Sequence, residues 1–329
     1  LFLFIMAASD NNNNNEVITD FFPFYRLYKD GRVERFYELY GMSEVPPSLE
    51  DPATGVSSKD VIISPHLSAR LYLPRNTVPN QKLPILVYYH GGGLVLGSAF
   101  FKTEHCYLNH LVSESSCIAI SVNYRLAPEH DLLTLYQDCW DALQWVSSHA
   151  VVATVNKEPW IENHGDFNRV FVGGDSAGGN IVYNMVMRAS KESLIGGVKI
   201  LGAIFAFPFL LIPSVENIEH TISYKLWVNI CPPSEPGLNS PLVNPVAEKS
   251  YSLSMLGCSR LFLCIGEKDE LIPREIGTQF VEAVKRSGWK GEIEFIEVEG
   301  EGHCFQCANP QTEKAKDLIK RMASFIQRK

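Results

Sequence analysis

Residues 170–180 read Val-Phe-Val-Gly-Gly-Asp-Ser-Ala-Gly-Gly-Asn, an apolar run that enters a Gly-x-Ser-x-Gly turn with Ser176 at its centre. This pattern is typical of a nucleophile elbow, where a strand turns sharply into a helix and lifts one hydroxyl clear of the backbone. Gly174 and Gly178 suit such a turn, because a Cβ at either position would crowd it. The alternative is a glycine-rich turn with a solvated serine, and the neighbouring motifs must decide.

Short continuous apolar runs surround this turn, at residues 84–89, 117–122, 169–173, 198–206 and 260–265. Strands that do not alternate with polar residues are expected where helices cover both faces of a sheet. Helical patterns lie between them, at residues 134–149, 178–190, 273–287 and 311–327. Residues 56–73 hold two β-rich runs and suggest an antiparallel start. We therefore predict an α/β fold with a mostly parallel central sheet flanked by helices.

Two segments break this alternation. Residues 17–45 mix aromatic and charged side chains without a clean period, which predicts a flap packed over an apolar surface. Residues 207–258 carry seven prolines and predict an inserted cap over the site, with a long irregular loop as the alternative. Residues 1–16, which include a run of asparagines, are expected to be disordered, so that residues 17–329 form a single domain.

The composition narrows the classes of partner and compartment. The formal net charge of −8 disfavours nucleic acid and anionic membranes and favours a small neutral or apolar ligand. Eight scattered cysteines suggest free thiols of a reducing compartment, and we expect a cytoplasmic protein. No run reaches the roughly 20 apolar residues of a membrane span. We expect translation to start at Met6, with a truncated secretory signal as the alternative.

A serine hydroxyl needs a base, and the base needs an acid that fixes its tautomer. Asp269 follows the apolar run at 260–265, in a loop at the carboxyl end of a predicted strand. Glu267 and Glu270 are rivals, but we favour Asp269. His303 follows the last predicted strand and is the one histidine after Asp269, which gives the order serine, acid, histidine. The predicted catalytic residues are Ser176, Asp269 and His303.

A second glycine motif, His90-Gly91-Gly92-Gly93, follows the apolar run at 84–89. Acyl transfer passes through a tetrahedral oxyanion, and one backbone N–H aimed at that oxygen contributes roughly 3 kcal/mol. We predict an oxyanion hole formed by Gly91, Gly92, Gly93 and Ala177, with Gly92 and Gly93 as the expected donors from the loop. A glycine run alone could be a turn, but its coincidence with the elbow favours the catalytic interpretation.

Together, residues 90–93, Asn-Tyr-Arg-Leu-Ala-Pro-Glu-His at 123–130 and Gly-Asp-Ser-Ala-Gly-Gly-Asn at 174–180 closely resemble the plant carboxylesterase branch of the hormone-sensitive-lipase-like α/β-hydrolases. The likeness extends over nearly the whole chain. It implies an α/β-hydrolase fold without a cofactor, with an N-terminal flap and a cap. It also implies the triad Ser176, Asp269 and His303 and an oxyanion hole in the glycines after His90.

The same branch contains proteins that are not esterases. Within this branch, gibberellin receptors lack the catalytic histidine, and hydroxyisoflavanone dehydratases often carry threonine as the nucleophile. Alkaloid cyclases of the branch have Gly-Ala-Gly in the oxyanion loop. This chain keeps Gly-Gly-Gly, Ser176 and His303. It departs from the branch at residues 131–136 and in the cap near residues 212–220, and both departures concern the substrate more than the chemistry.

The remaining candidates concern the pocket. We expect aromatic side chains to line an acyl or alcohol pocket, with Phe100, Phe101, Phe207, Phe209, Tyr224 and Trp227 as candidates. Cys304 and Cys307 form a C-x-x-C beside His303, but a structural zinc site needs four ligands and no second such pair is present. We therefore expect no metal, and thiols packed near the histidine.

The sequence thus predicts a carboxylesterase that forms an acyl-enzyme with a small ester or alkaloid-like substrate. We expect the protein to be a monomer or a homodimer. A lyase, cyclase or dehydratase acting on a plant alkaloid or flavonoid is the first alternative. A non-catalytic small-molecule receptor is the second. Specificity depends on cap and flap geometry, which no motif encodes.

Overall fold

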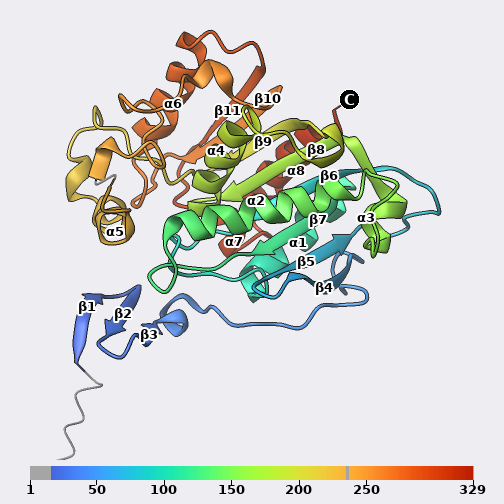
Figure 1. The fold of residues 1–329 in the computed structure, drawn as a ribbon, viewed down its shortest axis with the longest axis horizontal. Helices are drawn as coiled ribbons and strands as arrows, with labels where there is room; N and C mark the ends of the chain where they lie inside the picture. Colours follow the sequence, from blue (N-terminus) through green and yellow to red (C-terminus); the bar gives the residue numbers. More distant parts are fainter. Residues whose placement is uncertain (1–15, 235–236, 329) are drawn as a thin grey trace, which may run out of the picture.

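An eight-stranded sheet forms the centre of the molecule (Figure 1) in the computed structural model, which describes residues 16–234 and 237–328. In spatial order the strands are β11 (Glu292–Val298), β10 (Arg260–Gly266), β9 (Ile200–Ala206), β8 (Gly165–Asp175), β6 (Leu83–Tyr89), β7 (Ile118–Asn123), β5 (Leu67–Leu73) and β4 (Ser57–Ser64). The pairs β4–β5 and β5–β7 are antiparallel, and the other neighbours are parallel. The predicted mostly parallel sheet with an antiparallel start is confirmed.

Strand β6 shows why these strands are continuously apolar. All seven of its residues are buried. Ile85 and Val87 belong to one hydrophobic cluster, whereas Leu86 and Tyr88 belong to another. Successive side chains of a strand point to opposite faces, so both faces of the sheet carry a core.

Helices cover these two faces (Figure 1). The first cluster contains side chains of α2 (Leu132–Ser148), α3 (Pro159–His164), α4 (Ala177–Ala189) and α6 (Arg274–Arg286). The second contains side chains of α1 (Lys102–Ser115) and α8 (Glu313–Gln327), which pack against each other. None of the described helices is long and apolar enough to cross a membrane.

Four of these helices, α2, α4, α6 and α8, coincide with the helical patterns in the sequence, but α1 was not predicted. Its buried positions include Glu104, Asn109 and Ser115. Polar residues at buried positions interrupt the apolar period that identifies an amphipathic helix. The buried Glu104 therefore explains why the helix was not predicted, and a buried glutamate is itself unusual in a protein core.

Residues 17–35 form a separate antiparallel sheet (Figure 1) of β1 (Val17–Phe21), β2 (Tyr25–Tyr28) and β3 (Val33–Arg35). Strands this short leave no period in the sequence. Arg35 connects this sheet to the main domain, because its guanidinium pairs with Glu129 at 2.6 Å and donates to the carbonyl of Ala127. A role of this sheet as a flap stays a prediction. The predicted disorder of residues 1–16 lies, apart from Glu16, outside the described residues.

The described residues of the proline-rich segment 207–258 form one regular helix, α5 (Ile222–Ile230), and short 3-10 turns at Ile218–His220, Gly237–Asn239 and Leu253–Met255. Several of its apolar side chains are buried, including Leu210, Leu211 and Trp227. Prolines remove backbone donors and prevent longer helices here. Its role as a cap over the site stays a prediction.

Candidate active site

The predicted site residues come from separate segments of the chain and meet at one edge of the sheet. The glycine loop follows β6, Ser176 follows β8, Asp269 follows β10 and His303 follows β11. These four strands are parallel, so their carboxyl ends lie at the same edge. Open α/β sheets place their ligand sites at this edge.

Ser176 has the backbone geometry of a sharp elbow, with φ of 52° and ψ of −114°. A positive φ at a non-glycine residue costs about 1–3 kcal/mol, and the surrounding structure must impose it. The Ser176 N–H donates to the carbonyl of Ala206 at 2.8 Å, and the Ser176 carbonyl accepts from the Phe209 N–H at 2.8 Å. These bonds attach the turn to the end of β9.

The two glycines of the elbow allow this close approach. A Cβ on Gly178 would lie 1.8 Å from the carbonyl oxygen of Tyr89, and one on Gly174 would lie 2.4 Å from the backbone of Gly178. Helix α4 can therefore start directly against the end of β6 only because both positions lack a side chain. The structure gives a physical reason for both glycines of the motif.

Asp269 and His303 are joined by a short hydrogen bond. Nδ1 of His303 donates to Oδ2 of Asp269 at 2.6 Å. Oδ1 of Asp269 accepts from the N–H groups of Leu271 and Ile272 at 2.9 and 2.8 Å, and its side chain is 2% exposed. With Nδ1 as donor, Nε2 of a neutral imidazole can accept a proton.

The rival carboxylates lie elsewhere. Glu267 accepts from the N–H of Gly300 at 2.7 Å, and Glu270 is exposed. Ser176 and His303 line one cavity, although none of the hydrogen bonds formed by the described residues joins the hydroxyl to the imidazole. Such bonds are often long before a substrate binds.

The glycine loop bends where a side chain would not fit. Gly92 has φ of +109°, and a Cβ on it would lie 2.2 Å from the carbonyl oxygen of Leu96. The loop approaches the elbow closely, because a Cβ on Gly91 would lie 2.4 Å from Oδ2 of Asp175. Gly93 lines the same cavity, and Ala177 is the first residue of α4, where N–H groups lack intrahelical acceptors. The three glycines of the loop thus line the cavity with Ser176, whereas Ala177 is not in its described lining, and their role as oxyanion donors stays a prediction.

His90 supports this loop from within. Its ring is 2% exposed and stacks on Tyr124, with 4.2 Å between centroids. Burial lowers the pKa of His90 to about 4, so the ring is neutral, and its Nδ1 donates to the Gly91 carbonyl at 2.8 Å. Tyr124 in turn donates to the His90 carbonyl at 2.6 Å. His90 thereby fixes the start of the glycine loop.

The cavity has a volume of about 330 Å³. It brings Ser176 and His303 together with the glycine loop, with residues of the N-terminal segment 24–42 and with residues of α1 and α5. Its lining includes Phe24, Tyr40, Met42, Phe101, Thr103, Glu104, Asp175, Phe209, Ser223, Leu226, Ile272, Cys304 and Cys307. A cavity of this size suits a small organic ligand.

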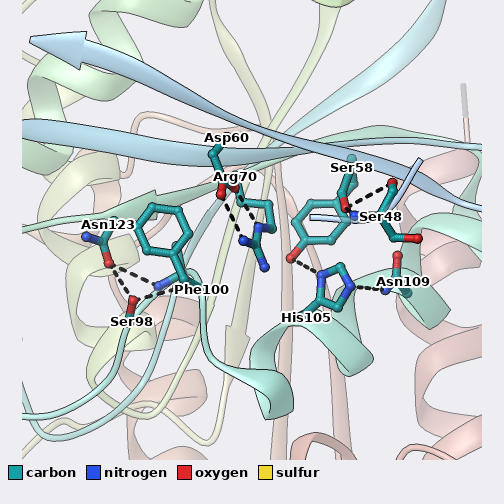
Figure 2. A network of polar contacts seen from close by, with 11 residues as sticks. Ser48, Ser58, Asp60, Arg70, Ser98, Phe100, His105, Asn109 and Asn123 are labelled. Atoms are coloured by element: carbon teal, nitrogen blue, oxygen red, sulfur yellow. Dashed lines mark hydrogen bonds and ion pairs between the residues drawn. The ribbon is translucent and has the colours of Figure 1, made fainter. Parts of the chain in front are cut away.

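Two of the six predicted aromatic residues, Phe101 and Phe209, line this cavity, and the other four are not among its described lining. Figure 2 shows Phe100 beside Arg70, and the guanidinium carbon lies 5.2 Å from the ring centre. Phe207 is buried with its ring edge-on to His303 at 5.9 Å. These positions follow from side-chain direction, which residue type does not reveal.

Tyr224 and Trp227 lie on α5. The Trp227 ring is fully buried, lies edge-on to Phe209 at 6.4 Å, and donates from Nε1 to the carbonyl of Gly237. It supports a wall of the cavity without being part of the lining. Tyr224 is half-buried on the same helix.

Comparison with known proteins identifies the fold family. A family profile described as alpha/beta hydrolase fold matches residues 86–307. The chain belongs to the α/β-hydrolase fold family. The chain is 46% identical to a 2-hydroxyisoflavanone dehydratase of Glycyrrhiza echinata, over 94% of this chain and 96% of the relative. It is 40% identical to a probable carboxylesterase 13 of Arabidopsis thaliana, over 95% and 98%. These relatives belong to the branch that the motifs resemble.

Among solved structures, an esterase of Pyrobaculum calidifontis matches this α/β hydrolase with a TM-score of 0.66 and 26% identity, over 82% of each chain. The resemblance of the sheet and its helices therefore extends to a distant esterase. The relatives agree on the fold and differ in the reaction that their names state.

Sequence reasoning missed part of the cavity wall of this α/β hydrolase. Glu104 and Asp175 line it, together with the thiols Cys304 and Cys307, which we had placed only near His303. Among the described residues, no group of three or more His, Cys, Asp or Glu side chains is arranged to hold a metal ion. The position of Asp175 directly before Ser176 could have indicated that it lies at the site. Glu104 gave no such signal, because a glutamate in a helix is normally exposed to solvent.

Proposed function

We propose that the protein is a carboxylesterase that cleaves small carboxylic esters, with plant specialised metabolites as the class of substrate, through an acyl-enzyme on Ser176. The hydrogen bond between His303 and Asp269, next to a cavity shared by His303 and the strained Ser176, is the observation that carries this proposal. This combination of nucleophile, base and orienting acid is what acyl transfer to serine requires.

In the proposed reaction, the Ser176 hydroxyl attacks the ester carbonyl while Nε2 of His303 takes its proton. The resulting oxyanion accepts hydrogen bonds from the N–H groups of Gly92, Gly93 and Ala177. The imidazolium then gives the proton to the leaving alcohol. Water, deprotonated by His303, attacks the acyl-enzyme and releases the acid and the free serine. Asp269 holds the imidazole in orientation throughout.

A second candidate is an elimination in the same cavity, because the protein shares 46% identity with a relative named as a dehydratase. There His303 would act as the base that removes a proton from carbon. The two reactions differ in their balance: hydrolysis consumes one water per product pair, whereas dehydration releases one. Product masses therefore separate the candidates.

The test is a panel of aryl acetates with wild type and Ser176→Ala, together with labelling by an organophosphate. We expect turnover and one label on Ser176 in wild type, and neither in Ser176→Ala. Ser223 lines the same cavity and donates to the Leu271 carbonyl, so Ser223→Ala is a matched control that should keep the label. Wild-type protein that neither turns over nor takes the label would refute the proposal.

A further inference from the structure

Two carboxyl groups lie in the cavity wall beyond the predicted catalytic residues. Glu104 comes from the first turn of α1 and Asp175 from the end of β8. Their residues are only 6% and 7% exposed, yet both line the cavity. Carboxyl groups this buried are rare unless a partner compensates for the lost water.

The partners of Glu104 are insufficient. Its Oε1 accepts one long hydrogen bond from the Ser121 hydroxyl at 3.3 Å, and its Oε2 has no partner among the described residues. Asp175 is better supported, because its Oδ1 accepts from the Tyr88 hydroxyl at 2.9 Å. Oε2 is not among the enclosed unpartnered atoms and Glu104 lines the cavity, so a ligand there can donate a hydrogen bond to it.

A second unpartnered atom lies in the same lining. Nε2 of His90 has no hydrogen-bond partner within the described chain, and Nδ1 of the ring donates to Gly91. Because the ring is neutral, Nε2 carries a lone pair and is an acceptor. This atom is itself buried, so it is Glu104 that offers a free acceptor to a ligand with donor groups.

The charge of the wall indicates the sign of that ligand. Burial and the neighbouring Asp175 raise the pKa of Glu104 well above its usual range. The described lining contains no lysine or arginine. Arg70 lies opposite Ser121 in the register of β5 and β7, but its guanidinium is paired with Asp60 at 2.6 Å (Figure 2). With no lysine or arginine in the described wall, burial favours the protonated forms of both carboxyl groups, and a ligand ammonium beside them would favour their ionised forms.

The rest of the cavity suits an organic cation. Aromatic rings line it, namely those of Phe24, Tyr40, Phe101 and Phe209. Ring faces attract ammonium groups, and the attraction increases when water is excluded. An ammonium group loses its hydration on entering such a space, and carboxylates with aromatic rings are the groups that compensate for this loss.

We propose that this cavity selects esters that carry a protonated aliphatic amine, which binds to Glu104 beside Asp175 while the ester carbonyl reaches Ser176. This inference rests on the proposed esterase function and names its substrate class. Glu104 is then a specificity-determining residue, and the amine keeps its proton throughout the hydrolysis.

The test compares esters of one acid that differ in a single atom type: the 2-(dimethylamino)ethyl ester and its neutral isostere, the 3-methylbutyl ester. Homologues with three- and four-carbon spacers allow for the unknown span between the subsites. We expect wild type to prefer the amine ester of the best spacer in kcat/KM by about tenfold to a hundredfold, the range for a hydrogen bond to a charged group. Glu104→Gln should reduce this ratio toward one.

Glu114→Gln is the matched control, since it makes the same chemical change at an exposed position of the same helix and should leave the ratio unchanged. A wild-type ratio near one for every spacer, or a ratio that Glu104→Gln does not alter, would overturn the inference. Circular dichroism of each variant establishes that it is folded.

Binding separates this inference from the esterase proposal. Calorimetry of the amine ester and its isostere with Ser176→Ala measures recognition without turnover. Tighter binding of the amine ester that is lost in Ser176→Ala/Glu104→Gln supports the acidic subsite even if wild type hydrolyses neither ester, a result that would refute only the esterase proposal. Equal binding of both esters overturns the subsite whatever the hydrolytic activity.

Discussion

Asp269 and Glu104 are both buried carboxyl groups at the carboxyl edge of one sheet, but the structure supports them very differently. Asp269 accepts from two backbone N–H groups and from His303, all within 2.9 Å. Glu104 accepts from one hydroxyl at 3.3 Å. Three donors fix a carboxyl group in position, whereas a group with one weak partner stays available to a ligand. The two environments fit the roles that we propose, orientation of the catalytic histidine for Asp269 and recognition of substrate for Glu104.

The largest expected effect removes the residue that Asp269 orients. His303→Ala should lower kcat for aryl acetates by about 10⁴-fold or more, because Ser176 loses its base. Steady-state kinetics with saturating substrate measures this. His66→Ala, a change at an exposed histidine, should have no effect. If His303→Ala retains a tenth of the wild-type activity, Asp269 does not orient a catalytic base. The proposed difference in role between Asp269 and Glu104 would then be wrong.

Asp269→Asn tests the fully supported carboxyl group itself. The amide oxygen can still accept from Leu271 and Ile272, but its NH₂ would face Nδ1 of His303 and favour the wrong tautomer. We expect kcat to fall by about 10⁴-fold with little change in the thermal midpoint. The exposed neighbour provides the control, as Glu270→Gln should keep full activity. Equal losses in both variants would contradict the assignment.

Gly92→Ala tests whether the loop facing Asp175 and Ser176 supplies donors. The new Cβ would meet the Leu96 carbonyl at 2.2 Å, so the loop must shift. We expect kcat to fall by about 10²–10³-fold, the effect of losing one oxyanion donor. Gly197 also has positive φ, at +70°, but no atom lies within 4 Å of its added Cβ. Gly197→Ala should lower stability and leave kcat unchanged.

The smallest expected effect concerns Glu104, and it is a gain in stability, whereas the earlier variants lose activity. Because its pKa is raised in the folded state, the native protein holds the proton more tightly than the unfolded chain, and stability falls as pH rises above the ordinary value of about 4.3. Glu104→Gln removes this loss, at about 1.4 kcal/mol for each unit by which folding raises the pKa. Thermal unfolding should show the midpoint of the variant rising relative to that of wild type as the pH increases above that ordinary value.

The control for that experiment is again Glu114→Gln, whose side chain is exposed and whose unfolding midpoint should follow wild type at every pH. A gap between Glu104→Gln and wild type that is constant with pH would mean that Glu104 carries no cost as a charged group. The contrast with Asp269 would then lose its energetic basis.

Much of the fold could be predicted because its signals are local. Continuous apolar runs such as 84–89 and 260–265 indicate strands buried on both faces, and strands β6 and β10 cover them. Helix α1 escaped because Glu104 and Asn109 occupy buried positions. The N-terminal sheet escaped because its strands are three to five residues long, too short for a period.

The sequence by itself determined the sheet, the elbow at Ser176 and the order of Asp269 and His303, because each depends on a short run of residues or on chain order. The tertiary structure decided which side chains share the cavity. It placed Phe101 in the lining and Phe100 against Arg70, and it brought Glu104 beside Asp175 across distant parts of the chain. Burial and the lack of partners are properties of the packed chain, so no local pattern can encode them.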